Sequence, residues 1–398
     1  MTFSQFRLRT GRVFDMLPVG VALLLALVVA SGLLIALQVS PLTAYSALLE
    51  GAVGTENAFA ETLVKAIPIM FVAIGICIAF RGGVVNIGGE GQMIAGALAG
   101  VTVTLAVGDS VGGLVIPLAI GAGFLAGALY GGLAGFLKAY FGVNEILSTI
   151  MLNQIAAQMM NYLLNGVLLD PAEAGLNNVP KTARIVEAAE LPRLSLTMPP
   201  FVAEMFSMEN AELFARTRLH FGLVIAVAVA VLTYVLLWRT SIGYRIRAVG
   251  QNDRAARYAG ISVRRYTVLA LFLSGGFAGL AGVVQVLGLQ YRLQTDGSPT
   301  GFTGSAGFNG IVAALFGGLN PLGAVPASIF FGGLLVGAQK MQRETGVSAS
   351  LITAINGIIV IFVVSSQLFV RRRTRRRLSE AEQVVDEPQP EEVRQPIT

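Results

Sequence analysis

Long apolar runs alternate with shorter polar segments along most of the chain. Ten runs are candidates for membrane spans, because about 20 apolar residues cross a hydrocarbon core of ~30 Å. They cover residues 17–37, 63–80, 90–107, 114–137, 144–169, 221–238, 266–290, 306–319, 322–340 and 350–369. The run 306–319 is short and the pieces around 81–92 are ambiguous, so nine or eleven spans stay open. The pattern predicts an all-α, polytopic transmembrane helical bundle.

Composition supports the same class. Of the 398 residues, 54% are hydrophobic and 13% are charged, against roughly 25% charged residues in soluble domains. The single cysteine, Cys77, lies inside an apolar run, so no intrachain disulfide can form. The single histidine, His220, lies at the mouth of a span, and an interfacial role fits it better than metal binding. We expect no metal site.

Charge predicts the orientation of the chain. Seven arginines and no lysine lie between Arg239 and Arg265. With both termini in the cytosol, cytosolic segments hold nineteen of the 28 Lys and Arg residues, as the positive-inside rule requires. We therefore expect a cytosolic N-terminus over 1–16, one transmembrane domain over 17–370 and a disordered cytosolic tail over 371–398. The segment 239–265 would be a cytosolic loop and 170–219 an outer loop, while the basic start of the tail would contact membrane lipids.

No catalytic motif is present in the sequence. The G-x-x-x-x-G-K-[ST] phosphate loop, the G-x-G-x-x-G dinucleotide pattern and the H-E-x-x-H metal pattern are all missing. We therefore expect that the chain is not an enzyme, carries no cofactor and binds no nucleic acid. If ATP drives its activity, the ATP and Mg²⁺ are expected on a separate chain.

The densest polar cluster among the apolar runs is RGGVVNIGGEGQ, residues 81–92, with five glycines in twelve residues. Such a sequence predicts a broken helix, which is tolerated where the backbone is buried in protein or lines a wet cavity. Glu90 is the key residue, because a carboxylate at membrane depth is costly and usually functional. It either belongs to a translocation path or gate, or pairs with Arg81 across a tight cytosolic turn.

A second polar feature lies in the run 144–169. Gln154, Gln158, Asn161 and Asn165 are spaced by 4, 3 and 4 residues, so they share one face of a helix. Asn153 flanks this amide stripe, and Asn144 and Glu145 open the span. Carboxamides offer donors and acceptors without net charge, which suits a neutral, hydroxyl-rich or heterocyclic solute. The alternative is that the amides join neighbouring helices.

Glycines recur at helical spacing in three of the predicted spans. Such small faces let helices approach closely, so we expect these residues to serve packing. They are Gly123, Gly127, Gly131 and Gly135, the pair Gly275 and Gly279, and the pair Gly333 and Gly337.

Four motifs carry a family resemblance. FRGGVVNIGGEGQMIAGALAG, NEILSTIMLNQIA, GYRIRAVGQNDRAARYAGI and GFNGIVAALFGGLNPLGA resemble the membrane permeases of bacterial ABC importers for simple sugars and nucleosides. That family also includes the branched-chain amino acid permeases. The resemblance covers most of residues 60–370, with the four motifs in the expected order, and NIGGEGQ is closest to the nucleoside-importer branch.

The resemblance implies a transport subunit in a bacterial inner membrane, driven by a separate cytosolic ABC ATPase. It implies a second permease subunit, identical or homologous, and an extracytoplasmic solute-binding protein. The solute would be a nucleoside first and a simple sugar second. Asn86, Glu90 and Gln92 would lie near the translocation path. A coupling helix near 245–260 would contact the ATPase through Arg245, Arg247, Gly250, Asn252, Ala255, Ala256 and Gly260.

The main alternative is an ion- or proton-coupled secondary transporter of a small polar solute. Such a carrier usually needs intramembrane acids, and Glu90 is the only strong candidate for one. It has no need of an arginine-rich coupling segment. A channel is weaker still, since no repeated filter sequence is present.

Overall fold

The computed structural model describes residues 21, 24–173, 175, 179–197, 212–214 and 216–348, together with 354, 357–358, 361–362 and 365. These residues belong to two compact units, one over Ser40–Ala349 and one made of Met1–Val39 and Ser350–Thr398. The second unit contains a helical stretch over Leu24–Ala36. The predicted tail 371–398, most of the predicted span 350–369 and the start of the span 17–37 lie outside the described residues.

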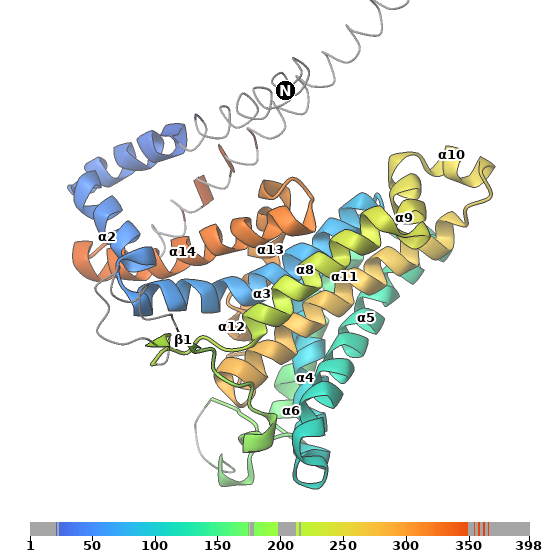
Figure 1. The fold of residues 1–398 in the computed structure, drawn as a ribbon, viewed down its shortest axis with the longest axis horizontal. Helices are drawn as coiled ribbons and strands as arrows, with labels where there is room; N and C mark the ends of the chain where they lie inside the picture. The colour runs from blue at the N-terminus through green and yellow to red at the C-terminus, as the bar shows by residue number, and fades with distance from the viewer. Residues whose placement is uncertain are drawn as a thin grey trace, which may run out of the picture. The chain divides into compact units, whose positions relative to one another are not determined.

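The described part of unit Ser40–Ala349 is mostly helical, with a long irregular connection between α6 and α8 (Figure 1). Its helices are α2 (Pro41–Val53), α3 (Glu56–Arg81), α4 (Gly89–Val111), α5 (Val115–Phe141), α6 (Glu145–Leu164), α8 (Gly222–Arg239), α9 (Ser241–Gln251), α10 (Asp253–Tyr258), α11 (Val263–Gln285), α12 (Pro299–Thr303), α13 (Ala306–Phe316) and α14 (Pro321–Thr345). A π-helical turn, Val286–Gln290, extends α11. Short 3-10 turns cover Gly112–Leu114, Pro171–Glu173 and Glu187–Ala189. Strands β1 (Leu196–Thr197) and β2 (Glu212–Leu213) pair antiparallel, with Leu196 opposite Leu213.

Six helices of the described chain are long and apolar enough to cross a membrane: α3, α4, α5, α8, α11 with its π-helical extension, and α14. Leu24–Ala36 and α2 pass the same test only when they are counted together. Helix α13 has 11 residues and covers only part of the predicted run 306–319. The all-α membrane bundle is confirmed, whereas the number of ten spans and the single domain over 17–370 stay predictions.

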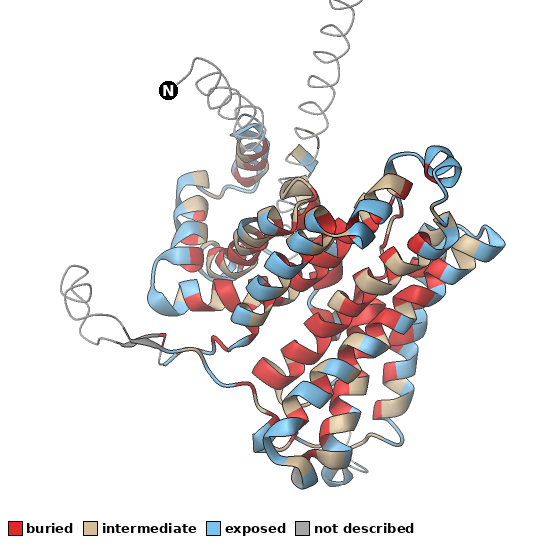
Figure 2. Cartoon of the chain, turned by 45° about the vertical axis from the view of Figure 1, so that its right-hand side comes forward, coloured by how far each residue is buried: buried red, intermediate tan, exposed pale blue. Residues whose placement is uncertain are grey.

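The core of the unit forms around α11, which packs against α5, α4 and α3, while α14 packs against α3 and α2. Figure 2 shows that buried residues follow the inner faces of these helices and exposed residues their outer faces. The glycine faces allow the close packing. A Cβ on Gly127 would lie 2.4 Å from the carbonyl oxygen of Gly275, and one on Gly279 would lie 2.3 Å from that of Gly123. These contacts confirm the predicted packing role.

The predicted break near 81–92 is also confirmed. Helix α3 ends at Arg81, Gly83 takes a positive φ of 74° in the turn, and α4 begins only at Gly89. A similar break separates α12 from α13, where Gly304 and Ser305 have φ values of 60° and 62°. Left-handed φ values end a helix because they cannot continue the right-handed turn.

The predicted coupling helix near 245–260 forms as two short helices. Asn252 is extended, with φ −158° and ψ 106°, so it ends α9, and its side-chain oxygen accepts from the N–H of Ala255 to cap α10. Gly260 follows with a φ of 76° and ends this region. Helices α9 and α10 lie at the opposite end of α8 from β1 and β2 (Figure 1).

The described part of the predicted outer loop packs along the far end of α11. The N–H groups of Ile185 and Leu191 donate to the carbonyls of Tyr291 and Leu287 at 2.9 Å and 2.8 Å. Lys181 forms an isolated bridge with Gln294, and Arg193 forms one with His220. This loop therefore covers the π-helical turn. The sequence also predicts a possible amphipathic helix near 200–214 in this loop, and residues 200–211 of it lie outside the described residues.

Candidate functional site

Glu90 lies buried at the N-terminus of α13. Its Oε1 accepts from the N–H of Phe308 at 3.1 Å, in the first turn of that helix. Gly307 makes room for the carboxylate, since a Cβ there would lie 2.7 Å from the Cδ of Glu90. The first turn of a helix presents unpaired N–H groups and a partial positive charge. Glu90 therefore caps α13 from the first turn of α4.

Arg81 contacts the other end of α13. Its Nε and Nη2 donate to the carbonyls of Leu319 and Gly318 at 3.1 Å and 3.3 Å, just beyond the last turn. These hydrogen bonds do not join Arg81 to Glu90. They therefore give no support to the alternative in which the two side chains pair across a turn. The two side chains instead contact opposite ends of α13.

Asn86 and Gln92 form a buried pair of amides. The Asn86 Nδ2 donates to Gln92 Oε1 at 2.9 Å and to Ser274 Oγ at 2.8 Å, while the Asn86 Oδ1 accepts from Gln92 Nε2 at 3.0 Å and from the N–H of Gly88 at 2.9 Å. A carboxamide has two donor hydrogens and two acceptor lone pairs. All four sites of Asn86 are thus used within the chain, and it ties the start of α4 to α11.

The first half of α6 is bound to the same region. Asn153 is buried, accepts from the N–H of Gly91 at 2.8 Å and donates to the carbonyl of Ile87 at 2.9 Å. Asn144 caps α6 by accepting from the N–H groups of Ile146 and Leu147. Glu145 pairs with Lys138. These three predicted path residues therefore fix the position of α6.

The amide stripe lies on the opposite side of α6. Gln154, Gln158 and Asn165 are exposed and Asn161 is half-buried, with the Asn165 Nδ2 donating to the carbonyl of Asn161 at 2.8 Å. The predicted common face is present, and it points away from the rest of this chain. Since polar groups are costly against lipid, this face requires another protein surface or water.

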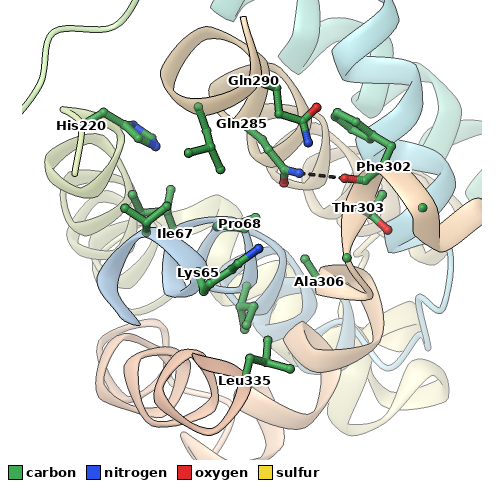
Figure 3. Close-up of a pocket in the computed structure, with 15 residues that line it drawn as sticks. Lys65, Ile67, Pro68, His220, Gln285, Gln290, Phe302, Thr303, Ala306 and Leu335 are labelled. Carbon is green, nitrogen blue, oxygen red and sulfur yellow. Dashed lines mark hydrogen bonds between the residues drawn. The ribbon is translucent and has the colours of Figure 1, made fainter. Parts of the chain in front are cut away.

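A cavity that the sequence analysis did not find lies between α3, the end of α11, α12 and α14 (Figure 3). It measures about 150 Å³, and its polar lining includes Lys65, His220, Gln285, Gln290 and Thr303. The Gln285 Nε2 donates to the carbonyl of Phe302 at 2.8 Å. Burial lowers the pKa of His220 to about 4, so its ring is neutral, and its Nδ1 accepts from the N–H of Gly222.

The predicted coupling residues divide into two groups. Ala255, Asn252 and Gly260 are exposed, whereas Ala256 is only 4% exposed and packs with Ile246 in the core of the chain. Gly250 lies against the backbone of Arg81, where a Cβ would approach its carbonyl oxygen to 2.1 Å. Ala256 and Gly250 therefore position α9 and α10 instead of presenting a surface.

Arginines bind α9 to the ends of three longer helices. Arg245 donates to the hydroxyl of Tyr266 at 2.9 Å. The guanidinium groups of Arg247 and Arg81 lie 5.8 Å and 5.4 Å from the centre of the Trp238 ring. A cation over an indole ring is attracted by its quadrupole. The Trp238 ring therefore lies against both Arg247 of α9 and Arg81, which contacts the carbonyls beyond the end of α13.

Tyr258 is the exposed residue that the sequence analysis missed in this region. It ends α10 and is 95% exposed. Tyrosine is enriched at protein interfaces, so Tyr258 is a candidate contact for a partner.

Comparison with known proteins identifies relatives over nearly the whole chain. Residues 58–364 match the family described as branched-chain amino acid transport system / permease component. The chain is 35% identical to the guanosine ABC transporter permease protein NupP of Bacillus subtilis, over 87% of this chain and 92% of that protein. It is 34% identical to the glucose ABC transporter permease protein TsgB13 of Haloferax volcanii, over 88% and 87%. It is 27% identical to the nucleoside ABC transporter permease protein NupB of Lactococcus lactis, over 86% and 89%. No solved structure matches.

Proposed function

The chain belongs to the branched-chain amino acid transport system permease family, and we propose that the solute carried by this ABC transporter permease is a nucleoside, with a simple sugar as the second candidate. Membership in this family makes the chain a transport subunit and not an enzyme, and implies a partner ATPase and a solute-binding protein. ATP and Mg²⁺ belong to the ATPase in this proposal, and this chain needs no cofactor of its own.

The observation that carries the solute proposal is the exposed amide stripe on α6. Gln154, Gln158, Asn161 and Asn165 offer hydrogen bonds without charge on a face that this chain leaves uncovered. An anionic solute would favour Arg or Lys contacts, because charge-assisted hydrogen bonds are roughly twice as strong as neutral ones. The names of the relatives, which are permeases for guanosine, nucleosides and glucose, agree with a neutral polar solute.

We propose that a second permease subunit, identical or homologous, faces the amide stripe across a shared path. Six of the predicted path residues then border that path without contacting solute, because they hold the ends of α4, α6 and α13. They are Asn86, Glu90, Gln92, Asn144, Glu145 and Asn153.

The proposed coupling site is formed by α9 and α10. The ATPase would contact Ala255, Tyr258 and the neighbouring arginines of α10, and closure around ATP would shift α9. Arg247, Trp238 and Arg81 would pass this shift to α13. Such a linkage biases the bundle between outward-open and inward-open states, which is alternating access.

We propose a bacterial plasma membrane location with both termini, α9 and α10 in the cytosol. The arginine-rich segment 239–265 and the basic tail support this orientation through the positive-inside rule. The described loop 179–197 then faces outwards, where the solute-binding protein would dock.

Uptake measurements test the solute proposal. Radiolabelled guanosine, adenosine, uridine and ribose are compared in a strain that lacks the transporter genes and in one that carries the complete transporter. We expect nucleoside uptake only in the second strain, with nucleosides competing against each other. If ribose competes and no nucleoside does, the nucleoside proposal is wrong while the transporter class stands. Uptake of an amino acid alone would overturn the interpretation of the amide stripe.

A further inference from the structure

One face of α5 is apolar and uncovered along most of the helix. Most of the exposed residues of α5 recur at steps of three or four, so they share one side of the helix. They are Leu118, Gly121, Leu125, Leu129, Leu133, Phe136 and Tyr140. The opposite side carries the glycines that pack against α11. Helix α5 lies at the edge of the bundle (Figure 1), and the described chain leaves this open face uncovered.

The open face of α5 fits the acyl chains of a membrane. The span that contains α5 has only 28% of its apolar stretch buried inside the chain, against 83% for α3. From Leu118 to Phe136 the face extends about 27 Å along the helix axis, close to the ~30 Å of a hydrocarbon core. Unlike the stripe on α6, the open face has no hydrogen-bonding side chain over that length. Phe136 therefore lies near one edge of the core.

Three aromatic rings lie together at this edge. The ring centres of Phe136 and Tyr140 are 4.9 Å apart, and those of Phe136 and Phe141 are 5.8 Å apart. All three side chains are exposed. Aromatic side chains of membrane proteins gather where the hydrocarbon core meets the headgroups, and tyrosine is among the most enriched there. This cluster indicates that lipid headgroups lie at the level of Tyr140.

A cation is held at the same level by the start of α11. Helix α11 runs antiparallel beside the end of α5, where a Cβ on Gly135 would lie 3.0 Å from the Cα of Val268. One turn nearer the start of α11, the Arg264 guanidinium lies 5.6 Å from the centre of the Tyr140 ring. A cation over an aromatic ring is attracted by the ring quadrupole. Tyr140 therefore holds Arg264 at the end of the open face.

Arg264 and Arg265 have no acidic partner within the described chain. Both are exposed, and neither takes part in an ion pair there. The acid that begins α6, Glu145, is paired with Lys138 of α5. The two guanidinium groups are thus available to an anion from outside the chain.

An anionic phospholipid matches both parts of this surface. A guanidinium binds phosphate oxygens through two parallel hydrogen bonds, and arginines near a membrane surface attract anionic lipids. Two arginines favour a headgroup with net negative charge over one whose choline cancels the charge of the phosphate. A soluble anion would make no use of the apolar face, whereas the acyl chains of a lipid would cover it.

We propose that Arg264, Arg265 and Tyr140 bind the headgroup of an anionic phospholipid whose acyl chains lie along the open face of α5. This site goes beyond the proposed function, because it needs neither solute nor ATP. It lies just after Gly260, which ends the region of α9 and α10. The bound lipid therefore ties the junction between α10 and α11 to the membrane surface.

Lipid titration of the purified complete transporter tests the site. The transporter is kept in a neutral detergent, and native mass spectrometry counts the bound phosphatidylglycerol or phosphatidylcholine, both with the same acyl chains. We expect the wild type to bind phosphatidylglycerol about tenfold more tightly than phosphatidylcholine, and Arg264→Gln to lose about fivefold of its affinity for phosphatidylglycerol. Arg239→Gln is the matched control, since Arg239 is an equally charged, exposed residue at the end of α8. It should change the affinity by about twofold or less, as an isolated exposed charge does.

Each outcome decides for or against the site. Equal affinity of the wild type for the two lipids would overturn it even if a variant failed to fold, and this is the result expected if the ATPase or the second permease subunit covers the surface. Unchanged binding of phosphatidylglycerol by Arg264→Gln would overturn it as well. An equal loss in Arg264→Gln and Arg239→Gln would show a diffuse attraction to positive charge in place of a site. None of these results bears on solute uptake, so the proposed function is tested separately.

Discussion

At the scale of single residues, hydrogen-bond capacity separates structural side chains from those available to a solute or a partner. Asn86 has the residue type expected of a path, yet its four hydrogen-bonding sites are all filled by Gln92, Ser274 and Gly88. Gln154 and Gln158, which have the same chemistry, are exposed. The sequence identified all of them as polar groups among apolar neighbours, but it could not distinguish satisfied amides from open ones.

Tyr258 gives a test at this scale. Tyr258→Ala should weaken co-purification of the ATPase with the permease about tenfold, because an exposed aromatic anchor typically contributes more than 1 kcal/mol at an interface. Tyr258→Phe keeps the ring and should retain the partner. Both variants should insert normally, since the side chain is 95% exposed and supports no core. Full retention of the ATPase by Tyr258→Ala would remove Tyr258 from the proposed docking surface.

The neighbouring alanine shows why such a surface cannot be assigned from the sequence alone. Ala255 and Ala256 are adjacent and chemically identical, but Ala255 is exposed while Ala256 packs against the core with Ile246. Which of them faces a partner depends on the break at Asn252, which sets the rotation of α10. The helical stretch and its end at Gly260 follow from the sequence pattern, whereas its rotation does not.

At the scale of elements, α13 is held at both of its ends by charged side chains from other parts of the chain. Glu90 caps its N-terminus and Arg81 holds the carbonyls beyond its C-terminus. Arg81 also shares the Trp238 ring with Arg247 of α9. One short helix is thus linked to the coupling region and to the buried start of α4.

Hydrophobic periodicity predicted most of the long helices and the break after Arg81, because glycines and apolar runs are visible in the sequence. It could not predict the π-helical turn over Val286–Gln290, since no proline or polar break in the predicted run 266–290 marks the place where the helix changes. Gln285 and Gln290 therefore gave no signal as a pair. They become neighbours only when the helix widens.

The packing of α5 against α11 is tested by glycine substitutions. Gly279→Ala should destabilise the protein by about 1–3 kcal/mol, the usual cost of overpacking, because the new Cβ would meet the carbonyl oxygen of Gly123 at 2.3 Å. Gly121→Ala is the matched control on α5, since nothing lies within 4 Å of its added Cβ. It should be neutral, or stabilise by up to about 1 kcal/mol through helix propensity. Thermal denaturation in detergent measures both, and equal midpoints for the two variants would refute this account of the interface.

At the scale of the whole molecule, two surfaces are left uncovered by the described part of the chain. The amide stripe of α6 faces away from its own bundle, and the exposed surface of α10 extends beyond it. The proposed second subunit would cover the stripe, and the proposed ATPase contact would cover α10. Charge along the sequence predicts the orientation. The uncovered side chains, in contrast, are visible only in the structure.

Cysteine labelling tests the orientation. Ala255→Cys on α10 and Ala188→Cys in the loop 179–197 introduce matched thiols at exposed alanines. The native Cys77 can stay in place, because it is fully buried in α3. In intact cells, a membrane-impermeant maleimide should label Ala188→Cys and leave Ala255→Cys unlabelled until the membrane is permeabilised. Labelling of Ala255→Cys from outside would reverse the orientation.

The most direct measurement is nucleoside uptake by proteoliposomes that contain this chain, its second permease subunit and the ATPase, with the solute-binding protein added outside. The account predicts uptake that requires ATP and Mg²⁺ on the side of α9 and α10, and that stops when the ATPase is replaced by a variant that cannot hydrolyse ATP. Uptake by this chain in the absence of the ATPase, driven by a proton or sodium gradient, would contradict the account and assign the chain to the secondary transporters.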